Sequence, residues 1–153
     1  MNVLFICEDY SLALMAQAIL ATLGGGRFRA YGAGYAPCAT HGAVIDFLAR
    51  HRMSVDGLRP ERLDGFRAAS APRMDFVITL AEVDENFSDW PGAPFIAHWN
   101  VLDEADDITR EPTQRDAFWT LMRRIKIFAS LPQGSLNRRV LERRALTLQA
   151  SYL

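Results

Sequence analysis

The chain has 153 residues, half of them hydrophobic, which is enough to bury the core of one ordinary globular domain. Its formal net charge is −1, so no strong positive field attracts nucleic acid or an anionic membrane surface. No stretch reaches the ~18–20 apolar residues that a membrane span needs, and the apolar run at residues 3–7 lacks a basic leader. We therefore expect a single cytoplasmic domain over residues 1–153.

The two cysteines, Cys7 and Cys38, form no CxxC pair and belong to no cluster with metal-ligand spacing. We expect no bound metal and no other cofactor. A reducing cytoplasm is the default compartment for such a chain.

The first two elements form a strand followed by a helix. The continuous apolar run at 3–6 is typical of a strand buried on both faces of a parallel sheet. From Ser11 the period changes to that of a helix, which Gly24 and the two following glycines end. The expected apolar stripe of this helix consists of Leu12, Met15, Ile19 and Leu23.

The rest of the chain continues this alternation. We expect strands at 28–31, 76–80 and 95–97, a turn at 32–34, and helices at 41–51, 115–131 and 134–150. The helix at 115–131 carries an apolar face of Phe118, Leu121, Met122, Ile125 and Phe128. Ser135 is the expected cap of the C-terminal helix. Strands that alternate with helices predict an α/β fold: one three-layer domain with a four-stranded parallel sheet flanked by helices.

Ligands of such sheets bind at the carboxyl ends of the strands. Three segments are expected to meet there: residues 7–11, the loop after Leu80 and the loop after His98. The first joins a strand to a helix, where free N–H groups commonly hold an anion. In this chain, however, Glu8 and Asp9 occupy the junction, and both repel anions.

Several segments resemble one known family. NVLFIC at 2–7, RFRAYGAG at 27–34, APRMDFVIT at 71–79, WPG at 90–92 and AHWNVLDEADD at 97–107 are similar to the low-molecular-weight protein tyrosine phosphatase superfamily, and most similar to its arsenate reductase branch. The resemblance covers about residues 2–131. It implies a cytoplasmic, phosphotyrosine protein phosphatase I-like α/β domain.

The resemblance also implies which residues would carry the chemistry. The family loop has the form C-x5-R-S, in which a cysteine thiolate attacks phosphorus or arsenic and the arginine clamps the oxyanion. Cys7 matches the nucleophile and Ser11 a loop residue, but Ala13 stands at the arginine position and Leu14 at the serine position. Asp103 aligns with the general acid, although Glu104 replaces the proline that usually follows. The resolving cysteines of the reductases are absent from 81–88.

These substitutions weaken an anion site. Without the arginine, a bound oxyanion loses charge-assisted hydrogen bonds worth roughly 1.5–3 kcal/mol each. Glu8 and Asp9 add repulsion of up to ~4 kcal/mol per charge pair at about 4 Å, and Tyr10 adds bulk. Because anions replace the cation, Cys7 should have no depressed pKa and should be mostly thiol at neutral pH.

Several alternatives stay open at the level of single residues. Asp9 either caps the helix and fills the anion site itself, or points to water. Cys7 is an inert strand-end residue or a weak nucleophile, and Asp103 is a surface residue or a relic of the general acid. His98 is expected to pack beside Trp99 rather than to bind a ligand. An acidic mouth holding a cation could also form from Glu8, Asp9, Asp103, Asp106 and Asp107, but no known metal-binding spacing supports it.

The sequence leaves two possible functions open, and they belong to different classes of protein. The first is a catalytically impaired phosphatase-like or arsenate reductase-like domain that binds an unknown protein or small ligand, or is structural. In it, Glu8, Asp9, Tyr10, Ser11 and Ala13 would form the binding loop. The second is an active phosphatase or arsenate reductase that uses Cys7. The four arginines at 138–144 could also pair with the acidic segment at 103–107 of a second copy, which predicts a homodimer.

Overall fold

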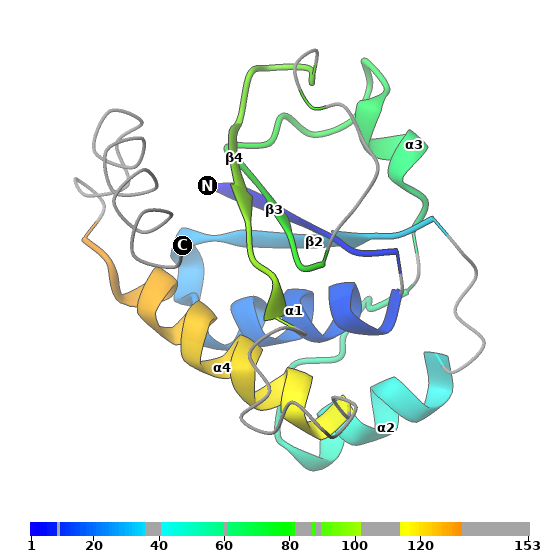
Figure 1. Cartoon of the computed structure of the whole chain (residues 1–153), viewed down its shortest axis with the longest axis vertical. Helices are drawn as coiled ribbons and strands as arrows, with labels where there is room; N and C mark the ends of the chain where they lie inside the picture. The colour runs from blue at the N-terminus through cyan, green and yellow to red at the C-terminus, as the bar shows by residue number, and fades with distance from the viewer. Residues whose placement is uncertain are drawn as a thin grey trace.

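Four parallel strands form one sheet in the order β2-β1-β3-β4 (Figure 1). The computed structural model describes residues 1–8, 10–35, 41–59, 61–81, 87, 90–101 and 114–132. The strands are β1 (Asn2–Ile6), β2 (Arg29–Ala33), β3 (Phe76–Thr79) and β4 (Phe95–His98). The expected α/β class and parallel sheet are confirmed.

The two central strands are the most apolar ones. Every residue of β3 is buried, and in β1 the run from Val3 to Ile6 is fully buried. Strands buried on both faces read as continuous apolar runs, which is why the sequence reveals them. In the register of the sheet, Ile6 pairs with Thr79 and Thr79 with His98, so these residues mark its carboxyl edge.

Helices lie on both sides of the sheet. Figure 1 shows α1 (Tyr10–Leu23), α2 (His41–Arg50) and α4 (Gln114–Ser130) on one side, and the short α3 (Leu63–Arg67) on the other. A 3-10 turn, η1 (Gly25–Arg27), follows α1. None of the helices within the described ranges is long and apolar enough to cross a membrane.

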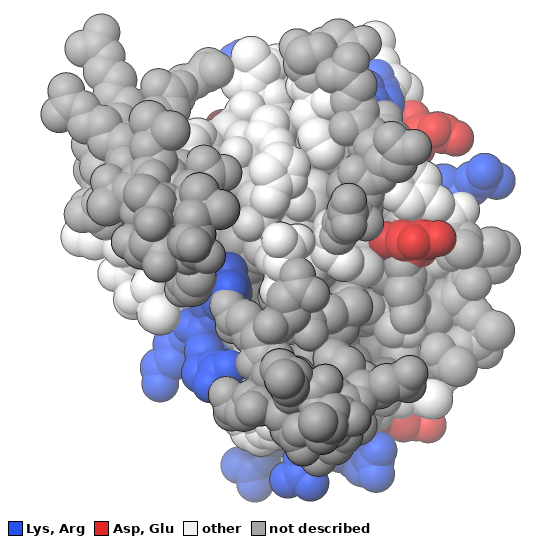
Figure 2. Space-filling model, in the orientation of Figure 1, with Lys and Arg blue, Asp and Glu red and all other residues white. Residues whose placement is uncertain are grey.

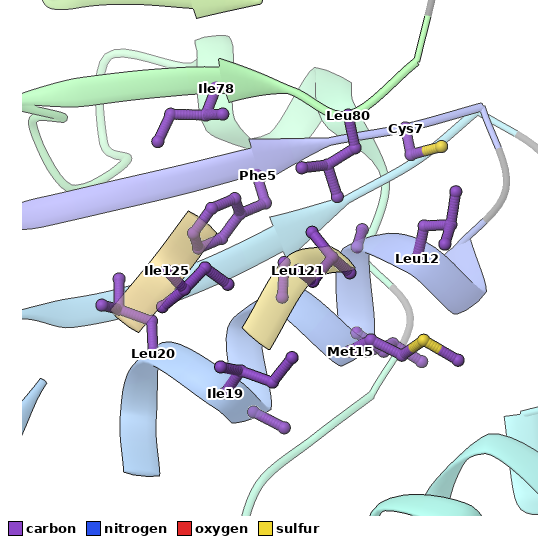
Figure 3. Close-up of a cluster of buried hydrophobic side chains, with 14 of the residues drawn as sticks. Phe5, Cys7, Leu12, Met15, Ile19, Leu20, Ile78, Leu80, Leu121 and Ile125 are labelled. Carbon is purple, nitrogen blue, oxygen red and sulfur yellow. The ribbon is translucent and has the colours of Figure 1, made fainter. Parts of the chain in front are cut away.

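The larger core cluster lies between the sheet and the α1, α2 and α4 layer. Figure 3 shows its centre, where Phe5, Ile19, Leu121 and Ile125 meet. The expected inner face of α4 is confirmed, because Phe118, Leu121 and Ile125 are at most 1% exposed. A smaller cluster around Leu4 lies on the α3 side.

The predicted turn at 32–34 is wrong at its first two positions. Gly32 and Ala33 belong to β2. Gly32 lets α1 approach the sheet, because a Cβ atom at this position would lie 2.8 Å from the carbonyl oxygen of Ala13. The glycine therefore serves close helix–strand packing rather than a turn.

Two other details differ from the sequence expectations. Leu23, expected on the inner stripe of α1, is 37% exposed, because the helix ends there and the chain turns away at Gly24. The short α3 was not predicted, since five residues give too little periodicity to recognise. The expected C-terminal helix at 134–150 lies outside the described residues.

Candidate functional site

Cys7 directly follows β1 at the carboxyl edge of the sheet. Its backbone N–H donates to the carbonyl of Ala33 at 3.2 Å, which extends the pairing with β2 by one residue. The residue is 2% exposed. Figure 3 places Cys7 in the same apolar cluster as Leu12 of α1 and Leu80, which follows β3. A cysteine in such surroundings behaves mainly as a small apolar residue that packs in the core.

The segments expected to converge at this edge do so where the structure describes them. The N–H of Leu80 donates to the carbonyl of Ile6 at 2.9 Å, and that of Trp99 donates to the carbonyl of Thr79 at 2.6 Å. The N–H of Val101 donates to the carbonyl of Leu80 at 3.0 Å. The carboxyl edge is thus held together by backbone pairing from β1 to the segment after β4.

Helix α1 starts soon after Cys7. It begins at Tyr10, so only residues 8 and 9 separate it from Cys7. Tyr10, Ser11 and Leu12 belong to the first turn of the helix, where their N–H groups follow the helix axis.

The ring of Tyr10 lies against Gly34, close to the backbone carbonyl of Cys7. A Cβ atom on Gly34 would lie 3.0 Å from the Cys7 carbonyl oxygen and 3.1 Å from the ring of Tyr10. The ring therefore packs directly on the backbone of Gly34, and Tyr10 is 3% exposed. A side chain at position 34 would be tight here, so that the Tyr10 ring or the Cys7 carbonyl would have to shift by a few tenths of an ångström.

Ala13, at the arginine position of the family motif, is completely buried. Its carbonyl faces Gly32 at the close helix–strand contact described above. Ser11 is 8% exposed. Of the described residues from 7 to 14, only Glu8 is exposed. This segment is a packed helix start with a carboxylate at its surface.

No basic residue occurs between Cys7 and Leu23, and the next ones along the chain lie at the far end of the sheet. The Arg27 guanidinium donates to the carbonyl oxygens of Ala129 at 3.1 Å and Leu131 at 2.7 Å. Arg29 pairs in register with Asn2, at the amino end of β1. Neither arginine therefore lies at the carboxyl edge of the sheet.

One basic residue at this edge was missed by the sequence reasoning. Arg62 forms an isolated parallel bridge with Gly34, and the N–H of Gly34 donates to the carbonyl of Glu61 at 3.1 Å. The side chain of Arg62 is exposed. A single bridge has no sequence signal, because it needs neither periodicity nor a run of apolar residues.

His98 satisfies a buried polar group. Its Nδ1 lies 2.7 Å from the Oγ1 of Thr79, which is 1% exposed. The imidazole is itself exposed and lies 6.1 Å from the ring of Phe87. Trp99 packs on Phe5 with ring centroids 6.2 Å apart. At the strand end, Trp99 thus packs on the core, whereas His98 is exposed and contacts Thr79.

Several predicted site residues lie outside the described residues. They are Asp9, Cys38, Asp103, Asp106 and Asp107. The proposed filling of the anion site by Asp9 and the acidic mouth therefore remain predictions.

No protein-family model and no curated protein sequence matches this chain. Solved structures do: an arsenate reductase in its phosphate-binding state superposes with a TM-score of 0.64 at 20% identity, over 84% of this chain and 96% of that one. A thioredoxin-dependent arsenate reductase from Corynebacterium glutamicum gives 0.63 at 23% identity, over 83% of this chain but only 59% of that one.

A third structure, an arsenate reductase from Archaeoglobus fulgidus, gives a TM-score of 0.62 at 17% identity, over 86% of this chain and the whole of that one. At these identities the likeness concerns the fold and not the chemistry. With its four parallel strands and flanking helices, the chain has the fold of the arsenate reductases, the branch that its motifs resemble.

Proposed function

We propose that this chain is a catalytically impaired domain with an arsenate reductase-like fold, which acts by binding a protein or small ligand or as a structural unit. The observation that carries the proposal is the burial of Ala13 and Tyr10. The position that would hold the oxyanion clamp is an alanine packed against Gly32, and the ring of Tyr10 packs on Gly34 close to the Cys7 carbonyl.

The physical consequence is a poor oxyanion site. An oxyanion at Cys7 would lack a bidentate guanidinium, whose hydrogen bonds contribute roughly 1.5–3 kcal/mol each. It would also approach the exposed carboxylate of Glu8. Each missing factor of ten in binding or rate corresponds to about 1.4 kcal/mol, so two lost bonds alone account for several orders of magnitude.

The proposal is tested by measuring catalytic turnover of the two family substrates. We expect neither hydrolysis of an aryl phosphate nor thioredoxin-coupled reduction of arsenate above the level of a Cys7→Ser control. Both assays should be run with an active arsenate reductase alongside, to show that the conditions support the reaction. Turnover that disappears in Cys7→Ser would overturn the proposal.

A second candidate is an active phosphatase or arsenate reductase. It is favoured by the retention of Cys7, Ser11 and Asp103, and by the bridge that brings Arg62 to the carboxyl edge. In this case Arg62 would replace the missing arginine as the cation. Activity lost in both Cys7→Ser and Arg62→Ala, but kept in Arg59→Ala, would identify this function.

We also infer a cytoplasmic location. Within the described part of the chain, Cys7 carries a thiol and is not in a disulfide, which fits a reducing compartment. Cell fractionation of the tagged full chain tests this inference, and recovery outside the cytoplasm would contradict it.

A further inference from the structure

The outer surface of α4 combines basic and apolar residues. The inner face of this helix packs on the core, but five of its large side chains are exposed. They are Arg115, Trp119, Arg123, Lys126 and Ile127. We call this set the α4 ridge.

The α4 ridge has a regular order. Four of its members follow each other at intervals of four residues, so that Arg115, Trp119, Arg123 and Ile127 lie along one line of the helix. Each step is about 6 Å along the axis. Basic and apolar side chains therefore alternate along the ridge, and Lys126 adds a third positive charge beside Ile127.

The apolar members are well placed for binding. Trp119 is 47% exposed, and its ring lies 5.1 Å from that of Phe118 and 6.1 Å from that of His51, which follows α2. These contacts hold the indole on the surface, so ordering it on binding costs little entropy. Ile127 is 66% exposed. Tryptophan and arginine are the residue types that most often dominate binding energy at protein interfaces.

The positive charge of the ridge is not neutralised by the described part of the chain. Helix α4 carries four basic residues and one acidic residue, Asp116. Arg124 is engaged elsewhere, over the ring of Trp99 at 5.9 Å. Among the described residues the one salt bridge is Arg59–Glu61, which involves no ridge residue. Figure 2 shows basic side chains at the lower left, over α4, where no acidic side chain is visible; other basic side chains lie along the bottom and on the right, where most of the visible acidic ones lie.

We propose that the α4 ridge docks an acidic amphipathic helix of a partner protein. Glutamates or aspartates at four-residue spacing on that helix would face Arg115 and Arg123, and the apolar side chains between them would cover Trp119 and Ile127. Complementary charge sets the partner and its register, and the apolar contacts supply affinity.

The charge of the ridge argues for this occupant over two others. A second copy packed on it through the same face would bring arginines and lysine together, which costs energy. A membrane would find only two exposed apolar side chains to insert, on a helix whose apolar face is already buried in the core.

This assignment names the partner class for the proposed binding role, but it does not depend on the state of Cys7. The ridge lies on the solvent side of α4, whereas Cys7 directly follows β1 at the edge of the sheet. Failure of the turnover assays and failure of the binding assay below are therefore separate outcomes.

The experiment uses the full chain and a labelled helical peptide of about five turns, in which glutamate and leucine alternate every four residues. Fluorescence anisotropy gives the affinity. We expect Arg123→Glu to weaken binding by at least about tenfold, and replacement of the glutamates by glutamine in the peptide to do the same. Trp119→Ala should weaken it by at least about fivefold.

Matched controls separate the ridge from general charge. Arg29→Glu makes the same charge change at an exposed position of β2, and Leu23→Ala removes another exposed apolar side chain. Both should stay within about twofold of the parent chain, and circular dichroism should show every variant folded. Equal weakening by Arg123→Glu and Arg29→Glu would overturn the proposal, as would the absence of measurable peptide binding.

Two further measurements address the other occupants. Binding to vesicles of equal parts phosphatidylserine and phosphatidylcholine that is lost in Trp119→Ala, without peptide binding, would assign the ridge to a membrane instead. A dimer in light scattering that dissociates in Arg123→Glu would assign it to a second copy. Either result would contradict the proposal that an acidic helix docks on the α4 ridge.

Discussion

At the scale of single residues, Ala13 stands at the position where the resembled family loop has its arginine. An arginine cannot simply be put back, because position 13 is completely buried against β2. We expect Ala13→Arg to lower the free energy of unfolding by about 3 kcal/mol or more, through overpacking and an uncompensated buried charge. Urea denaturation measures this effect. Ala21→Arg, an exposed position on the same helix, should change stability by less than about 0.5 kcal/mol. Similar values for the two variants would contradict the described packing.

The thiol of Cys7 is a second test at this scale. Because Cys7 is 2% exposed among apolar side chains, we expect it to react with iodoacetamide more slowly than free cysteine, with a midpoint no lower than the ordinary thiol pKa of ~8.5. The measurement needs a Cys38→Ser background, which leaves Cys7 as the single thiol. Fast alkylation with a midpoint near neutral pH would show an activated thiolate.

At the scale of elements, the contact between α1 and β2 positions the whole segment after Cys7. A Cβ atom at Gly32 would meet the Ala13 carbonyl oxygen at 2.8 Å and the Gln17 Oε1 at 3.0 Å. We expect Gly32→Ala to destabilise the fold by about 1–3 kcal/mol, because backbone has to move. Gly26→Ala meets no atom within 4 Å and serves as the control, with a change below about 0.5 kcal/mol. Thermal unfolding of both variants measures these changes in stability.

At the scale of the whole molecule, we propose that the chain forms a homodimer through its C-terminal arginines at 138–144 and the acidic segment at 103–107. Light scattering at micromolar concentration should then give twice the chain mass, and higher salt should favour the monomer, because screening weakens charge pairing. Removal of residues 135–153 should leave a monomer. A monomeric mass at every concentration would contradict the dimer, and a dimer that survives the truncation would contradict the role of these residues.

Much of this architecture could be predicted from the sequence. The runs at 3–6 and 76–80 identified the central strands, and the apolar face at 118–128 identified α4. Such elements are recognisable because burial on both sides, or on one helical face, imposes a period on the sequence. The order of motifs also indicated the arsenate reductase fold, and the resemblance to the family loop placed Ala13 at its arginine position.

The tertiary structure determined the features that hydrophobic periodicity in the sequence cannot reveal. Gly32 and Gly34 are in contact with Ala13 and Tyr10, residues about 20 positions earlier in the chain, so their role as spacers between helix and strand has no local signature. The same holds for Arg62, which reaches the carboxyl edge through a single bridge, and for the α4 ridge, whose exposure depends on which side of the helix faces the sheet. The sequence by itself, through its resemblance to the family loop, determined which residue stands at the arginine position, namely Ala13. Only the tertiary structure decided that Ala13 is completely buried against β2, because close contact between distant backbone segments depends on the whole fold.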